Sequence, residues 1–204
     1  MKTIKNNAKN SNTTKERLLS SGAILICEKG YTGVSVREIC KHANTSMNMI
    51  HHYFTNKEGL LNAITNSYGD NVFKFALKLL AKEPMSKEDF ISRIELVFET
   101  TLEACIENRL VLMITIREQK SPAALMDYMT GFKAFIDIGI KKGFARQTLD
   151  SEMITGFILD RIVNQVQFAP WVNAEYGIDL LTDQNYIKRW AQSNVDVFIN
   201  GIVN

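Results

Sequence analysis

Three short stretches of the sequence place a threonine or serine three residues before a glutamate, close to where a run of apolar residues begins. They are Thr13–Glu16, Ser35–Glu38 and Thr55–Glu58. In such a capping box the hydroxyl accepts a hydrogen bond from the third residue of a helix, and the glutamate bonds back to the cap. Because only three prolines interrupt the 204 residues, long helices can follow these starts.

Apolar residues recur at helical spacing through the rest of the chain. Ser86 and the pair Ser121-Pro122 are further helix starts, while Gly30 and Gly143 are predicted ends. We find no hairpin dipeptide and no sustained alternation of apolar and polar residues, so the predicted class is all-α. The expected helices are about 13–29, 35–43, 47–53, 55–80, 86–105, 108–120, 121–142, 151–172 and 183–199.

Positive charge is concentrated at the N-terminal end. Residues 1–60 carry nine Lys or Arg and four Glu, whereas the remaining residues carry 15 basic and 18 acidic side chains. This division predicts an anion-binding module joined to a mildly acidic body. Residues 1–12 have almost nothing to bury and are predicted to be a disordered basic tail. The tail is either a solvated terminus or an arm that contacts phosphates.

The cysteines and the hydropathy pattern indicate a cytoplasmic, soluble protein with no membrane association. Three cysteines without a CxxC spacing are expected to be free thiols. The N-terminus lacks the apolar core of a secretory signal, and no apolar run approaches the length needed to span a bilayer.

Catalysis and metal binding are not expected. Sequence motifs typical of serine hydrolases, zinc proteases and nucleotide-binding loops are absent. His51 and His52 are adjacent and would project about 100° apart on a helix, with no acidic residue between them. We therefore predict no enzyme activity, no cofactor and no metal site.

Residues 35–57 form the most informative pattern. A short helix, a three-residue turn at Asn44–Ser46 and a second short helix predict a helix-turn-helix. The expected inward-facing residues are Ile39, Ala43, Ile50, Tyr53 and Phe54.

This region resembles the N-terminal domain of TetR-family transcriptional regulators over residues 13–62. The matching residues are Gly30-Tyr31, Val34 to Ile39, Ala43 to Ser46, and Ile50 to Leu61. Departures from the family pattern are Asn44 in place of a glycine, Thr45 in place of a valine, Asn48 at a position that is often glycine, His51 in place of a tyrosine and Tyr53 where histidine is common. Asn44 still suits the turn, because asparagine tolerates left-handed φ.

A helix of this kind fits the major groove of DNA, where side chains at its N-terminal end reach the base edges. The resemblance implies that Arg37, Met47, Asn48 and Met49 read bases. Asn48 suits adenine, and the two methionines suit thymine methyl groups. The candidates for phosphate contacts are Ser35, Thr45, Ser46, His51, His52, Tyr53 and Lys57, of which the resemblance favours His51 and Lys57.

The remaining chain is expected to be a regulatory and dimerisation domain over residues 61–204, following a DNA-binding domain over 13–60. The resemblance implies that the last two long helices of two subunits form a four-helix bundle. Candidate interface residues are Ile154, Phe157, Ile158, Asp160, Arg161, Ile162, Gln165, Trp190, Val197 and Phe198. For each of them, a place in the core of a single subunit is an equal alternative.

The resemblance also implies a small-molecule pocket in the helical body. Candidate lining residues are Phe98, Leu102, Met113, Ile116, Arg117, Met126, Phe132, Phe135, Asn164, Phe168 and Trp171. Methionine and aromatic side chains adapt to varied apolar ligands, although such residues more often form ordinary core. Asp160, Arg161 and Asn164 are expected either at the subunit interface or as a polar anchor for a ligand.

These observations predict a homodimeric repressor that leaves a near-palindromic double-stranded DNA operator when a small hydrophobic effector binds. Activation instead of repression, and regulation without a ligand, remain open. The main alternative is a helical protein-binding adaptor whose basic head binds DNA without sequence preference.

Overall fold

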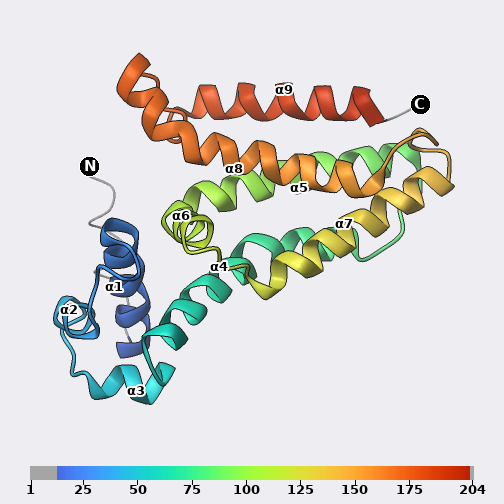
Figure 1. Cartoon of the computed structure of the whole chain (residues 1–204). Coiled ribbons are helices and arrows are strands. Elements are labelled where there is room, and N and C mark those ends of the chain that lie inside the picture. Colours follow the sequence, from blue (N-terminus) through green and yellow to red (C-terminus); the bar gives the residue numbers. More distant parts are fainter. Residues whose placement is uncertain (1–12, 203–204) are drawn as a thin grey trace. The chain divides into compact units, whose positions relative to one another are not determined.

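The computed structural model describes residues 13–202, except the side chains of Asn71 and Ile202 (Figure 1). The predicted tail at residues 1–12 lies outside the described part. Within it all regular elements are helices and no strand occurs, which confirms the all-α class. None of these helices is long and apolar enough to cross a membrane. The helices are α1 Thr14–Lys29, α2 Val36–His42, α3 Asn48–Phe54, α4 Lys57–Leu80, α5 Lys87–Glu107, α6 Arg109–Arg117, α7 Ala123–Lys141, α8 Ser151–Tyr176 and α9 Gln184–Ile202.

Two of the three predicted capping boxes form. Thr13 and Ser35 cap α1 and α2, and in each box the glutamate bonds back to the backbone of its cap. The third prediction is wrong by one residue, because Asn56 Oδ1 accepts the hydrogen bond from Gly59 N at 2.8 Å. Thr55 instead ends α3, with its N–H bonded to His51 O and a φ of 70°.

The chain divides into two compact units. The first comprises the chain up to Tyr68 together with Leu110–Pro122, and the second comprises Gly69–Arg109 and the chain from Ala123 onward. Residues 110–122 therefore belong with the helix-turn-helix, although the sequence placed them in the body. The reason is burial, since Ile114 is fully buried among core residues from α1 to α4.

The core of the second unit is built from aromatic side chains of α4, α5 and α7. Phe90 stacks on Phe135 with ring centroids 5.3 Å apart, and Phe73 lies 4.8 Å from Tyr128. α8 packs on α5 and α7, and α9 packs on α5. These contacts bury one face of each helix, which is the main source of stability for helices in proteins.

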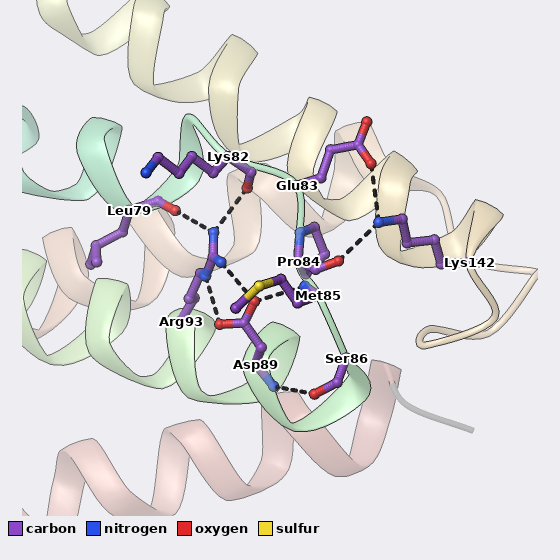
Figure 2. Close-up of polar contacts among 9 residues, drawn as sticks. All are labelled: Leu79, Lys82, Glu83, Pro84, Met85, Ser86, Asp89, Arg93 and Lys142. Atoms are coloured by element: carbon purple, nitrogen blue, oxygen red, sulfur yellow. Dashed lines mark hydrogen bonds and ion pairs between the residues drawn. The ribbon is translucent and has the colours of Figure 1, made fainter.

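A polar cluster joins the end of α4 to α5 (Figure 2). The Arg93 guanidinium donates to both carboxylate oxygens of Asp89, at 2.9 and 2.6 Å, and to the backbone oxygens of Leu79 and Lys82. Hydrogen bonding from Arg93 lowers the pKa of Asp89. Arg93 thus satisfies carbonyl groups that the end of α4 leaves without helical partners.

Candidate nucleic-acid interface

Contacts from α1 fix the turn between α2 and α3. Arg17 Nε donates to Ala43 O at 3.2 Å, and His42 Nδ1 lies 2.9 Å from Ser21 Oγ. Asn44 adopts the left-handed conformation that the sequence predicted, with φ of 50°. The two short helices are therefore held by the longer α1 as well as by their own core.

α3 has one buried face and one exposed face. Ile50 and Phe54 are buried in the core of the first unit, whereas Asn48, His51 and His52 are exposed. Most of the residues that the sequence predicts to contact DNA therefore lie on α3 and on the turn before it. Around them, Met47 and Ser46 are exposed, while Met49 and Thr45 are half-buried. Tyr53 was predicted to face the core, but it is 39% exposed.

The N-terminus of α2 adds Arg37 and Ser35. The side chain of Arg37 is exposed and forms no hydrogen bond with the other described residues. Ser35 donates its hydroxyl hydrogen to Glu38 Oε2 at 2.8 Å, so this hydroxyl is already engaged in the capping box. Arg37 is thus the more available of the two for a ligand.

The capping carboxylate of α2 is strongly held in its charged form. Hydrogen bonds from Ser35 and from the Lys29 ammonium lower the pKa of Glu38 to about 2. Because the folded-state pKa is depressed, this stabilisation is present above the ordinary carboxyl range and is lost as the pH falls toward 2.

His51 lies in the last turn of α3, and one of its ring nitrogens is already engaged. Its Nδ1 is 2.8 Å from Thr55 O, and a carbonyl can only accept, so Nδ1 carries a hydrogen. Nε2 is then the nitrogen left for an outside partner. It donates to a phosphate only when the ring is doubly protonated.

Lys57, at the first residue of α4, has an intramolecular contact that the sequence did not reveal. Its ammonium group donates to Tyr31 O and lies 4.3 Å from the centroid of the Tyr31 ring. An ammonium has three donors, so a phosphate contact is compatible with this bond. Lys57 therefore also anchors the loop after α1.

The segment Leu110–Pro122 forms hydrogen bonds with the C-terminal end of α1 and with the loop that follows it. Arg117 donates to the backbone oxygens of Ile26 and Cys27, and Glu118 accepts from Tyr31 N at 3.0 Å. The sequence placed Arg117 in the small-molecule pocket. In the structure it donates to backbone carbonyls at the end of α1 in the first unit, and no local sequence pattern predicts these bonds.

The other pocket candidates are divided between the two units. Phe98, Leu102, Phe132 and Phe135 are buried in the second unit, whereas Met113 and Ile116 are half-buried in the first. Met126, Asn164, Phe168 and Trp171 are exposed. Among the described residues, none of the three-residue His, Cys, Asp or Glu groupings that hold metal ions occurs.

α8 carries apolar side chains on two faces. Ile158, Ile162 and Val166 are buried, but Phe157 and Trp171 on the other face are 57% and 56% exposed. Of the predicted interface residues, Phe157, Asp160, Arg161 and Val197 are exposed, Ile154, Gln165 and Trp190 are half-buried, and Ile158, Ile162 and Phe198 are buried.

Comparison with known proteins identifies the family. The family described as "Bacterial regulatory proteins, tetR family" matches residues 18–64. A probable HTH-type transcriptional regulator of Bacillus subtilis strain 168, YttP, is 30% identical over 197 residues, which are 89% of this chain and 93% of that protein. The chain belongs to the TetR family of transcriptional regulators.

Two further known proteins are similar to this TetR-family regulator. The HTH-type transcriptional repressor KstR2 of Rhodococcus jostii strain RHA1 is 25% identical over 156 residues, covering 72% of this chain and 74% of that protein. The transcriptional regulator FadR of Bacillus subtilis, solved in complex with stearoyl-CoA, has a TM-score of 0.68 at 19% identity and covers 91% of this chain and 98% of its own. The latter likeness shows a shared fold.

Proposed function

We propose that this TetR-family regulator is a homodimeric repressor that binds a near-palindromic operator and leaves it when a small molecule binds the second unit. The observation that carries the proposal is the exposed face of α3. It presents Asn48, His51 and His52 to solvent, while the opposite face is anchored in the core, and Arg37 on α2 is exposed as well.

DNA contacts divide into two kinds. Arg37, Met47, Asn48 and Met49 are proposed to meet base edges, because they lie at the N-terminal ends of α2 and α3. Ser35, Thr45, Ser46, His51, His52, Tyr53 and Lys57 are proposed to meet phosphates, which position the helix without reading sequence.

Dimerisation is supported by the exposed apolar face of α8. Met153, Phe157, Phe168 and Trp171 are all more than half exposed, and their spacing places them on one side of the helix. An apolar stripe of this kind typically marks an interaction site. We propose that a second copy of the chain packs against this face. A dimer would supply the two recognition helices that must enter successive major grooves about 34–36 Å apart.

Repression and release by a ligand are supported by the relatives. KstR2 is named a repressor, and FadR was solved with stearoyl-CoA. A ligand releases DNA only if it binds the DNA-incompetent state better than the DNA-bound state, so its effect is a shift of populations. We propose an apolar or amphipathic effector for this chain.

The test is fluorescence anisotropy of the dimer against DNA upstream of its coding region, with a shuffled duplex of equal composition as control. We expect the native duplex to bind at least about a hundredfold more tightly, as specific regulators do. Equal, weak binding to both duplexes would contradict the proposal and favour the adaptor with a non-specific basic head.

Asn48→Ala should relax discrimination at one base pair of each half-site. The exposed amide can pair with adenine in two hydrogen bonds, worth about 1–3 kcal/mol against a wrong base. Affinities for a set of singly substituted operators measure the effect. Uniform weakening across all operators would instead mean that Asn48 contacts the backbone.

Lys57→Ala should weaken binding to every duplex and lower the slope of log affinity against log salt by about one, because one phosphate contact is lost. Lys133→Ala, on α7 of the second unit, is the control and should leave the slope unchanged. Since Lys57 also bonds Tyr31 O, thermal unfolding must be measured in parallel. If Lys57→Ala lowered the thermal stability but left the slope of log affinity against log salt unchanged, Lys57 would have only a structural role.

A further inference from the structure

His51 and Thr55 form two hydrogen bonds with each other where α3 ends. Thr55 N donates to His51 O at 3.1 Å, and His51 Nδ1 lies 2.8 Å from Thr55 O. Thr55 has a φ of 70° and a ψ of −47°, so the chain turns back and its carbonyl oxygen meets the ring. A non-glycine residue rarely adopts a positive φ, and the two bonds help to hold Thr55 in this conformation.

The bond to Thr55 fixes the tautomer of a neutral His51 ring. A neutral imidazole has a single N–H, and the carbonyl oxygen requires that hydrogen on Nδ1. Nε2 then carries a lone pair, which cannot donate to a phosphate. Only the doubly protonated ring has a second N–H, at Nε2, for an anion outside the chain.

His52, the next residue, is not constrained in this way. It is exposed, and its ring lies edge-on to Tyr53 with centroids 4.7 Å apart, but it forms no hydrogen bond with the other described residues. A neutral His52 can therefore present an N–H from either nitrogen by changing its tautomer. Of the two adjacent histidines, only His51 must gain a proton before it can donate outward.

The described residues of the first unit supply no anion for a protonated His51. The carboxylates there are Glu16, Glu28, Glu38, Glu58 and Glu118. None of them forms an ion pair or a hydrogen bond with His51. The cationic groups are Lys15, Arg17, Lys29, Arg37, Lys41, Lys57, Arg117 and Lys120, and the other imidazoles are His42 and His52. The anion that stabilises the charged ring must therefore come from outside, as a DNA phosphate does.

We propose that DNA binding by this chain takes up a proton at His51, so that the affinity for DNA rises as the pH falls from 8 to 6. The inference rests on the proposed function, in which His51 meets a phosphate, and it adds a pH dependence to that contact. An imidazole changes its charge between pH 5 and 8. Because the bound state holds the extra proton more tightly than the free state, binding is strengthened where protons are abundant.

The expected effect is large enough to measure. An opposite charge at hydrogen-bonding distance favours the charged form of an ionisable group by about tenfold or more. A dimer carries two His51 rings. We therefore expect the dimer to bind the duplex from upstream of its coding region at least about tenfold more tightly at pH 6 than at pH 8.

The experiment measures fluorescence anisotropy at pH 6, 7 and 8 and constant ionic strength, with the upstream duplex and with the shuffled duplex. His51→Gln has a polar side chain that does not titrate, so it should lose most of the pH dependence. His51→Lys stays charged throughout this range and should bind about equally at pH 6 and pH 8. His52→Gln is the matched control, and it should keep the pH dependence of the parent whatever its affinity at pH 6.

Calorimetry of the same binding reaction at pH 7, in two buffers with different enthalpies of ionisation, measures the protons directly. We expect a net proton uptake in the parent and in His52→Gln, and none in His51→Gln. Equal pH dependence and equal proton uptake in the parent and in His51→Gln would overturn the proposal.

Failure of this inference is distinguishable from failure of the proposed function. Specific binding to the upstream duplex without any pH dependence would overturn proton uptake at His51 and leave the regulator intact. Equal binding to both duplexes would contradict the proposed function, yet a pH dependence that disappears in His51→Gln would still support the inference. A protein that binds neither duplex would overturn both.

Discussion

Replacing Phe168 with aspartate should convert the protein to a monomer and lower its affinity for a two-fold operator by at least about a hundredfold. Phe168 is 54% exposed on the apolar face of α8, together with Phe157 and Trp171. An unpaired carboxylate buried in an interface costs several kcal/mol. Each head would then bind its half-site alone, without the effective concentration that the partner head supplies.

Sedimentation equilibrium and operator anisotropy measure these two effects on the same preparation. Met126→Asp is the matched control, because Met126 is 63% exposed but lies in the first turn of α7. There a negative charge interacts favourably with the helix dipole. A dimeric Phe168→Asp protein with full operator affinity would show that this face of α8 does not join the subunits.

Gly139→Ala should lower the free energy of unfolding by about 2 kcal/mol through overpacking. A methyl group at Gly139 of α7 would overlap the ring of Phe90. That ring is fully buried and stacked on Phe135, with Phe144 a further neighbour at 6.3 Å, so it cannot move without displacing other aromatic side chains.

Gly131→Ala on the same helix should instead raise the free energy of unfolding. Its methyl group would meet Leu77 Cδ2 at 3.6 Å, which is an ordinary contact. Alanine is better than glycine in a helix by about 0.5–1 kcal/mol. Urea unfolding of both variants measures the pair. If both variants lost the same free energy of unfolding, overlap with the Phe90 ring would not be the cause of the loss in Gly139→Ala.

Local sequence patterns located the helices and the helix-turn-helix, although α8 ends at Tyr176 and not near Val172. The boxes at Thr13 and Ser35, the turn at Asn44 and the end at Gly30 are found as predicted, because each depends on bonds within a few residues. The cap at Asn56 was missed, since the sharp reversal after α3 assigns Thr55 to the end of that helix.

The features of the candidate interface that the sequence did not predict are hydrogen bonds between residues far apart in the chain. Lys57 bonds Tyr31 across 26 residues, and Arg117 bonds Ile26 across 91 residues. A local pattern records the charge of such residues but not their partners. The sequence therefore predicts Arg117 in a pocket, whereas in the structure its guanidinium donates to the backbone oxygens of Ile26 and Cys27 at the end of α1.

α8 is the clearest example of what the sequence predicts and what only the tertiary structure decides. Its apolar residues predicted a helix and its family resemblance implied an interface, but periodicity alone did not distinguish Ile158 from Phe157. The packing of α8 on α5 and α7 buries the face of Ile158, and it leaves the face of Phe157 exposed. Helical propensity and capping depend on near neighbours, whereas the choice between two apolar faces depends on which surfaces the other helices offer.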